Sequence, residues 1–199
     1  MATFAFPSIT PATNTFELVS NTRTYQSPLT NAVQTASRKG SLWKASLQFN
    51  NLSGDDRKVM QAFLVKLNGQ QHRFTLQDHS HTLRGAGGGN LVVNGASQSG
   101  TTLVCDGATA NVNNYLRAGD YVSFNNELHM VVVDTNSDGS GNVSIAIAPP
   151  IRKSPPDDTI VDYTAPVQGV FMLAGPASWD TQPGIISSFT IEAVEDVLA

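Results

Sequence analysis

The sequence predicts a mainly β protein: a split β-barrel or sandwich with one flanking α-helix and an inserted small β-domain. Residues 41–78 change from the period of a strand to that of a helix and back again. Five short strand patterns separated by tight turns follow, which is typical of a small barrel or sandwich. Two strand patterns near the C-terminus have no later partner in the sequence. We therefore expect them to pair with the N-terminal strands.

Residues 1–30 are rich in Pro, Thr and Asn. The start, around Phe6-Pro7, is predicted to be an extended segment or an edge strand, because Pro cannot donate a hydrogen bond to a neighbouring strand. Residues 15–19 form a strand pattern. Residues 31–40 are small and polar and form either a loop or a hairpin.

The strand–helix–strand unit follows. Within residues 42–50 every second side chain is apolar, which indicates a half-buried strand. Ser53 can cap a helix that carries Asp55 and Asp56 in its first turn, where negative charge suits the helix dipole. Asn68-Gly69 can end this helix in the left-handed conformation. The apolar positions of the helix, at helical spacing, are Met60, Phe63, Leu64 and Leu67.

The rest of the chain reads as turns and strands. The glycine run at residues 85–89 indicates a linker or hinge. Pro149-Pro150 closes the following strand module, and residues 154–158 form a second linker. Strands are predicted at 73–77, 91–93, 102–105, 121–124, 128–133, 143–147, 167–173 and 185–194, with Trp179 in the loop between the last two. The predicted division is a discontinuous barrel domain of residues 1–88 and 153–199, with residues 89–152 inserted as a small β-barrel.

Composition narrows the classes of function. Charged residues make up 14% of the chain, below the roughly 25% of an ordinary soluble protein. Removing water from such a surface costs less free energy, which favours burial of the surface against other proteins. The net charge of −4 and the lack of a basic run disfavour direct binding of nucleic acid. No apolar stretch approaches the roughly 20 residues that insertion into a membrane needs. Cys105 is the single cysteine, so no internal disulfide is expected. The first residues do not resemble a signal peptide, so we expect synthesis in a cytoplasm.

Motifs that could carry chemistry are weak. His79 and His81 could bind zinc only with further ligands from elsewhere, and polar loop residues explain them better. Residues 134–139 match the first half of a calcium loop, but Ile145 stands where the bidentate Glu is needed. The glycine run matches no nucleotide fingerprint. The acids Asp120, Glu127 and Asp134 lie at strand ends and turns without a distinguishing context. We therefore predict no catalytic residue, no metal site and no cofactor, and we do not expect an enzyme.

Three side chains are candidates for contacts with other proteins. Phe4 and Phe6 lie on a segment too irregular to bury them locally, and Trp179 lies among Pro and Gly residues, where an indole stays exposed unless a partner covers it. In the alternative interpretation each of them packs under its own domain. For Trp43, on the inner face of a strand, the second interpretation is preferred.

Two parts of the sequence resemble a known family. The stretch from Trp43 to Phe49, the helix through Leu67 and the stretch from Phe74 to Asp78 resemble the core of distal tail proteins of tailed bacteriophages. Stretches 93–100, 116–120 and 147–152 resemble a module of phage tail-tip and baseplate proteins. The resemblance extends from about residue 15 to residue 194.

This resemblance implies a homo-oligomeric ring, commonly a hexamer, at the end of the tail tube. The ring would join the tail tube to the tail hub and the receptor-binding parts, and the inserted domain would lie on its outside. The protein would be assembled in the bacterial cytoplasm and end in the tail of the virion. From the length of the chain we do not expect the large C-terminal carbohydrate-binding domain that some relatives carry. The alternative function is a β-sandwich module that binds a host glycan or another cell-envelope component.

Overall fold

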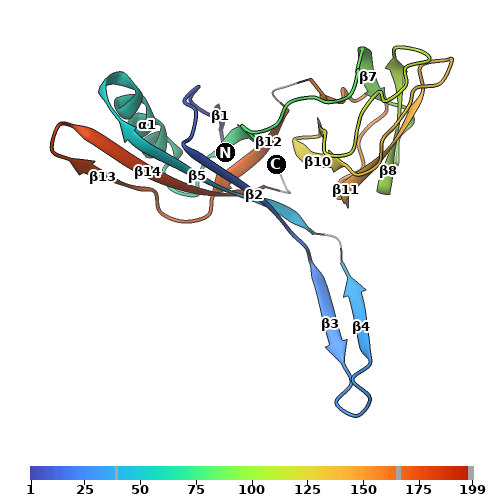
Figure 1. The fold of residues 1–199 in the computed structure, drawn as a ribbon, viewed down its shortest axis with the longest axis horizontal. Coiled ribbons are helices and arrows are strands. Elements are labelled where there is room, and N and C mark those ends of the chain that lie inside the picture. Colours follow the sequence, from blue (N-terminus) through green and yellow to red (C-terminus); the bar gives the residue numbers. More distant parts are fainter. Residues whose placement is uncertain (39, 165–166, 197–199) are drawn as a thin grey trace.

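The computed structural model describes residues 1–38, 40–164 and 167–196. The fold is mainly β, with 48% strand and 7% helix, and one helix occurs in the described part of the chain. Its strands form a mixed sheet of seven strands, a curled half-barrel sheet of five strands and a separate two-stranded hairpin (Figure 1). The predicted fold class is therefore confirmed. No helix among the described residues is long and apolar enough to cross a membrane.

The seven-stranded sheet combines strands from both ends of the chain. Near the C-terminus, β14 (Ile186–Glu195) pairs with β5 (Leu42–Leu52), and β12 (Gln168–Leu173) pairs with β6 (Arg73–Gln77). The expected return of the C-terminal strands to the N-terminal ones is thus present. The sheet order is β1-β6-β12-β14-β5-β2, with β13 beside β14; the remaining bounds are β1 Thr3–Ala5, β2 Thr13–Val19 and β13 Ser178–Gln182.

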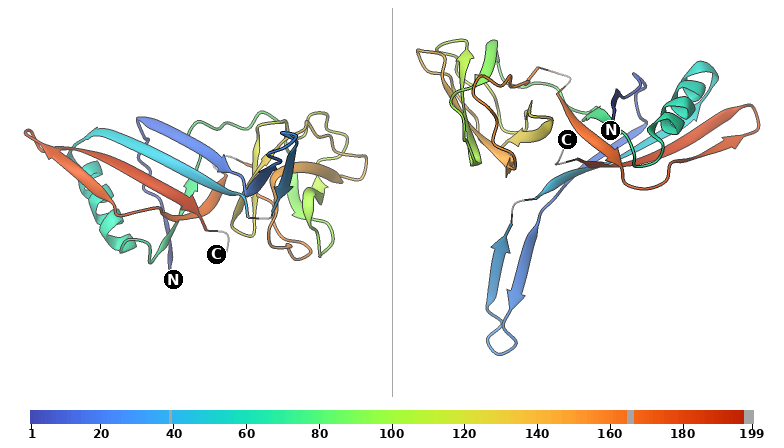
Figure 2. Two further views of the ribbon diagram at one scale, coloured as in Figure 1. Left: turned by 90° about the horizontal axis from the view of Figure 1, so that it is seen from below. Right: turned by 180° about the vertical axis from the view of Figure 1, so that it is seen from behind.

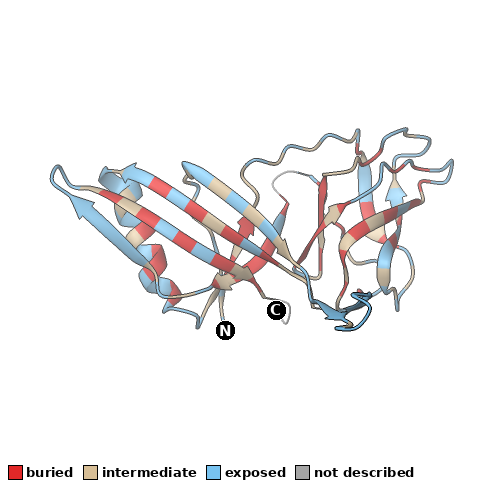
Figure 3. Ribbon diagram, turned by 60° about the horizontal axis from the view of Figure 1, so that its bottom comes forward, coloured by how far each residue is buried: buried red, intermediate tan, exposed pale blue. Residues whose placement is uncertain are grey.

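The helix α1 (Gly54–Leu67) covers one face of this sheet. It begins after Ser53, whose side chain makes no capping hydrogen bond, and it ends at Asn68 in the left-handed conformation. Burial alternates along β5 and β14 as the sequence pattern requires (Figure 3). The helix and the inner face of the sheet share one apolar core, which includes Leu47, Phe49, Met60, Leu64, Phe74, Phe171 and Ile191.

The five-stranded sheet has the order β7-β8-β11-β10-β9 and its own apolar core. Residues 159–163 run between its two edge strands: Val161 N donates to Leu91 O over 2.9 Å, and Asp162 N donates to Ser123 O over 2.9 Å. This segment follows the predicted domain boundary at residue 152 and yet closes the module. The strands are β7 (Gly89–Val93), β8 (Gly100–Ala108), β9 (Tyr121–Phe124), β10 (Glu127–Val131) and β11 (Val143–Ile151).

The glycine run is packed, which differs from the linker that its composition indicates. A Cβ on Gly85 would lie 2.3 Å from the carbonyl oxygen of Tyr115, so only glycine fits there. Gly87 N donates to the same oxygen over 2.9 Å, and Gly88 N donates to the Tyr163 hydroxyl over 3.0 Å. The glycines therefore allow close packing of two backbones, and the run is not a free hinge.

The β3–β4 hairpin projects from the body of the molecule (Figures 1 and 2). Its strands β3 (Thr22–Gln26) and β4 (Val33–Ser37) pair with each other, from Thr22 opposite Ser37 to Gln26 opposite Val33. All ten strand residues are exposed. A loop and a hairpin were both open for residues 31–40; residues 33–37 lie in a hairpin strand, and residue 39 lies outside the described residues.

Two further predictions need correction. Trp179 lies in strand β13, where a loop was expected; β13 pairs with β14, with Trp179 opposite Phe189. Pro149-Pro150 does not end the module strand, since β11 continues through both prolines to Ile151. Its register shifts between Ala146 and Ile151, so the prolines lie where the regular ladder is already interrupted.

Candidate functional site

The β3–β4 hairpin is the first candidate contact surface. Its side chains reach no core residue: both strands are exposed on both faces, and Leu29 at the tip is 93% exposed. Tyr25 and Val33 also expose more than half of their surface. A two-stranded hairpin alone is marginally stable in water. The hairpin therefore carries apolar groups and unpaired strand edges that a partner could cover.

The outer strands of the seven-stranded sheet offer further edges. Among the described strands, β2 pairs only with β5, and β13 pairs only with β14. All five residues of β13 are exposed. The two edges differ in sequence and lie on opposite sides of the β14–β5 pair, so joining the edge of one copy to that of the next would be a head-to-tail contact.

The predicted contact residues Phe4 and Phe6 are half-buried against their own subunit. The ring of Phe6 lies 5.2 Å from that of Phe63 and 5.8 Å from that of Phe74. Phe4 lies at the edge of the sheet, with the Lys66 ammonium 4.0 Å from the centre of its ring. Both side chains therefore pack within the monomer, and only their exposed edges are free for the predicted contact.

The predicted contact residue Trp179 keeps 37% of its surface exposed. The other face of its indole lies against Phe189, with the ring centres 6.2 Å apart. The side chain thus sits on an exposed edge strand, where it could contact a neighbouring molecule. Its role in an interface stays a prediction.

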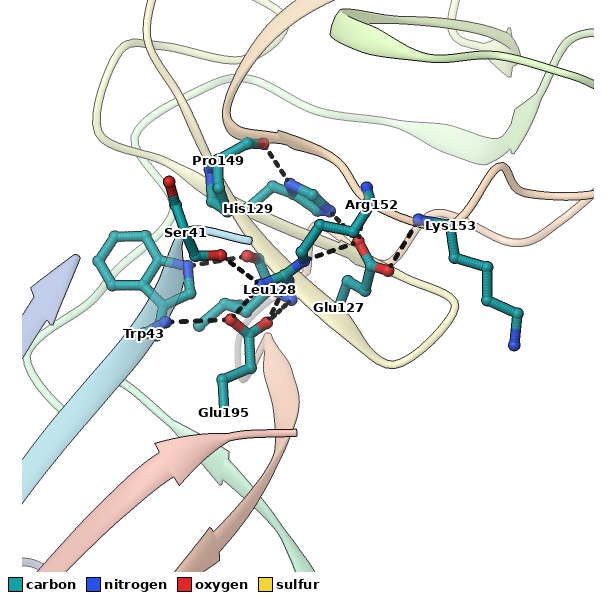
Figure 4. Close-up of polar contacts among 9 residues, drawn as sticks. All are labelled: Ser41, Trp43, Glu127, Leu128, His129, Pro149, Arg152, Lys153 and Glu195. Carbon is teal, nitrogen blue, oxygen red and sulfur yellow. Dashed lines mark hydrogen bonds and ion pairs between the residues drawn. The ribbon is translucent and has the colours of Figure 1, made fainter. Parts of the chain in front are cut away.

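A buried polar cluster joins the two larger sheets (Figure 4). The indole nitrogen of Trp43, on β5, donates to the carbonyl oxygen of Leu128, on β10, over 2.8 Å. Glu195, on β14, accepts from the backbone nitrogens of Trp43 and Leu128 over 3.1 and 3.0 Å. These bonds cross between the sheets, and Leu128 itself packs in the core of the seven-stranded sheet. The two sheets are thus fixed to each other.

Arg152 links two acids in this cluster. Its Nη2 lies 2.6 Å from Glu195 Oε1, and its Nε lies 3.2 Å from Glu127 Oε2. Burial raises the pKa of Glu127, but the nearby His129 and Arg152 outweigh burial and hold that pKa below its ordinary value. Glu127 is therefore a carboxylate that neutralises buried cations. This role of Glu127 could not be predicted from the sequence, because Arg152 lies 25 residues further along the chain.

The acidic residues that the sequence offered for calcium binding or catalysis have structural roles. Asp138 accepts from the backbone nitrogens of Ser140 and Asn142, each over 2.8 Å, which is the pattern of a hairpin turn. Asp120 is fully buried and accepts three backbone N–H groups, from Arg84, Gly85 and Arg117. Its carboxylate thus holds the glycine run in place.

The two histidines of the possible zinc motif pack against different aromatic rings. His79 lies beside Phe6, and the pKa of its imidazole is lowered, mainly by burial and against the charge of Asp78. His81 packs edge-on against Tyr121. Within the described residues no three His, Cys, Asp or Glu side chains come together as a metal site would require.

Comparisons with protein-family models and with curated proteins found no match for this chain. Three features of the molecule bear on its function: the projecting hairpin, the open edges of the seven-stranded sheet and the fixed joint between the sheets.

Proposed function

We propose that this protein is a structural component of a bacteriophage tail tip, a distal tail protein that forms a ring between the tail tube and the tail hub. The observation that carries the proposal is the β3–β4 hairpin, whose strands find no packing partner in their own subunit. A hairpin of this kind is stabilised when it adds its edges or its exposed apolar side chains to another chain. The sequence resemblance to distal tail proteins points to the same class of function.

In the proposed ring, copies associate head to tail. The edge at β2 and the edge at β13 are different surfaces, and a rotation that closes such a contact gives a ring. The hairpin adds a second contact to the neighbouring copy, and the ring needs both contacts to hold together. The resemblance suggests a hexamer, located in the virion tail after assembly in the bacterial cytoplasm. The tail tube, the hub and the tip proteins would be its partners.

The glycan-binding alternative receives less support from the residues of the five-stranded module. Sugar-binding surfaces commonly use exposed aromatic rings, but Tyr115, Tyr121 and Phe124 are all buried. For an enzyme, the acids Asp120, Glu127 and Asp134 are occupied by structural hydrogen bonds and ion pairs. Assembly accounts for more of the exposed features than either alternative.

The test compares the full chain with a variant that has a shortened hairpin. Replacing residues 23–36 by Asn-Gly joins Thr22 to its partner Ser37 through a tight turn. We expect the full chain to form rings in negative-stain images and a multi-subunit mass in light scattering. The variant should be a monomer with an unchanged melting temperature, because the removed residues contact no core.

A matched control is Val104→Ser, which changes an exposed valine on the five-stranded module, away from the hairpin. It should assemble like the unaltered chain. A full chain that remains monomeric at every concentration would contradict the proposed ring. If the shortened variant assembled as well as the full chain, the hairpin would not be part of the assembly contact.

A further inference from the structure

An open groove on the five-stranded module is used by none of the contacts described above. It has a volume of about 570 Å³ and runs between β7 and residues 160–164. Val92 and Ile160 line it, and they lie opposite each other in a β-bridge. Leu91 and Val161, their neighbours along the chain, are buried in the core of the module, so Val92 and Ile160 face outward. Ile160 is 75% exposed, and the groove therefore has an uncovered apolar centre.

Acidic side chains lie beside this apolar centre. Asp106, on β8, is opposite Val92 and therefore lies in the same row across the sheet. Asp162 follows Ile160 by two residues, so it lies on the same face, and it also lines the groove. Neither carboxylate forms an ion pair with a described residue. The groove thus combines an apolar surface with negative charge that no cation of its own subunit neutralises.

One face of the β3–β4 hairpin has the opposite charge and also carries an aromatic ring. Arg23 and Tyr25 lie two residues apart on β3 and so face the same way. Arg38 lies on this face too, because its backbone nitrogen donates to Asn21 O over 3.0 Å and so continues the strand pairing. All three side chains are exposed. Within the part of the chain that the structure describes, neither arginine is in an ion pair.

Charge is divided unevenly between the hairpin and the rest of the chain. Residues 20–40 contain three basic residues, Arg23, Arg38 and Lys39, and no acidic one. Because the whole chain has a net charge of −4, the other residues together carry −7. Two copies therefore attract each other when the hairpin of one faces the body of the next, and they repel each other when body faces body.

The spacing of the two surfaces also matches. Tyr25 and Arg23 are two strand positions apart, which is about 7 Å. Ile160 and Asp162 are two residues apart in an extended segment and have the same separation. We propose that this face of the hairpin docks into the groove of the neighbouring copy. Tyr25 covers Ile160, and Arg23 pairs with Asp162.

This inference rests on the proposed ring, for which it names the surface that receives each hairpin. Every copy gives one hairpin and receives another, as a head-to-tail contact requires. Val104, the control position for ring formation, does not line the groove. The docking site adds a condition that the ring alone does not impose: assembly depends on the charges of two particular side chains.

The first test exchanges these two charges. Arg23→Glu alone, or Asp162→Arg alone, places like charges against each other. We expect each to raise the protein concentration at half-assembly, measured by light scattering, about tenfold or more. The variant with both changes restores an opposite pair and should recover most of the loss. Lys58→Glu, the same change of charge at an exposed helix position, should leave that concentration nearly unchanged. Rings that tolerate both single changes, or a double variant no better than the single ones, would overturn the docking site but not the ring.

The second test separates the hairpin from the groove. The shortened-hairpin variant keeps its groove and Asp162→Arg keeps its hairpin, so each supplies one half of the contact. At a concentration where each variant alone is monomeric in sedimentation velocity, we expect an equimolar mixture to contain heterodimers. Such dimers also show that both variants are folded, although Asp162 accepts from the Thr164 backbone nitrogen over 3.1 Å in the unaltered chain.

The outcomes distinguish this inference from the proposed ring. If the mixture stays monomeric while the unaltered chain forms rings, the groove belongs to another partner and the docking site is wrong. If the unaltered chain itself is monomeric at every concentration, the ring is wrong and this inference fails with it.

Discussion

Arg152 and Glu195 form a two-point ion pair across the junction of the two sheets. Arg152 Nη2 lies 2.6 Å from Oε1 of Glu195 and Nη1 lies 2.8 Å from Oε2, with the two side chains 7% and 0% exposed. Nη1 also donates to the carbonyl oxygen of Ser41 over 2.9 Å. One guanidinium thus contacts the C-terminal strand β14 and the residue that precedes β5, although it follows the last strand of the other sheet. Its fixed fork geometry suits this role, which a lysine could not fill.

Replacing Arg152 should be costly. Arg152→Met leaves Glu195 as a buried, unpaired charge, and we expect the free energy of unfolding to fall by about 3–5 kcal/mol. The control is Arg117→Met: Arg117 lies 3.8 Å from Asp134 in an exposed pair, so the loss there should stay below about 1 kcal/mol. Denaturant titration measures both. Similar losses for the two variants would mean that burial does not strengthen the Arg152 contacts.

The two tryptophans should differ in the same kind of experiment. Trp43→Phe keeps most of the apolar volume but leaves the Leu128 carbonyl oxygen without the donor that crosses the junction, at a cost of about 1–3 kcal/mol. Trp179→Phe, at an exposed edge strand, should change the stability of the monomer by about 0.5 kcal/mol or less. Chemical denaturation of a non-assembling variant measures both. A larger loss for Trp179→Phe would show that this ring belongs to the core.

Phe6 and Phe4, in the N-terminal segment, should contribute differently to the stability of the subunit. Phe6→Ala removes a ring that packs on three other phenylalanines, so we expect about 3 kcal/mol of lost stability, at the low end for phenylalanine because Phe6 is partly exposed. Phe4→Ala loses contacts with Lys66 and His72 at the edge of the core and should cost about 1 kcal/mol. Thermal and denaturant unfolding give these values. If Phe6→Ala kept its stability but no longer assembled, Phe6 would be an interface residue and not a core residue.

Glu127 should contribute to stability on the acid side. Its pKa in the folded protein lies below the ordinary value of about 4.3, so its contribution is complete above that value and is lost as the pH falls toward the lowered pKa. Glu127→Gln should therefore lose less stability between neutral pH and about pH 3 than the unaltered chain does. Unfolding free energies across this range provide the measurement. Asp138→Asn serves as the comparison, because it removes a carboxyl group on an exposed turn whose pKa is also lowered.

Local patterns predicted most of the elements. The alternation of Trp43, Ala45, Leu47 and Phe49 placed β5, and the spacing of Met60, Phe63, Leu64 and Leu67 placed the helix. Period and burial agree there because each element has one face in a core. The β3–β4 hairpin and β13 have no buried face, so they lack that signal, and β13 was missed.

The joint between the sheets could not be predicted in the same way. Glu127, Arg152 and Glu195 come together from positions separated by tens of residues, and no local period marks a buried charge. One signal was present: Glu195 ends a strongly alternating strand at a position where the pattern requires a buried residue. A charged residue at such a position needs a partner of opposite charge. The glycine run was misinterpreted because glycines that allow close packing have the same composition as a flexible linker.

The β3–β4 hairpin is the outward continuation of β2 and β5, since Val19 faces Leu42 just before Thr22 faces Ser37. A pull on its tip would load both strands lengthwise. Because β5 is hydrogen-bonded to β14 over most of its length, that load would reach the sheet as shear, which many bonds resist at once. A pull on the hairpin would therefore be opposed by the hydrogen-bonded ladder between β5 and β14.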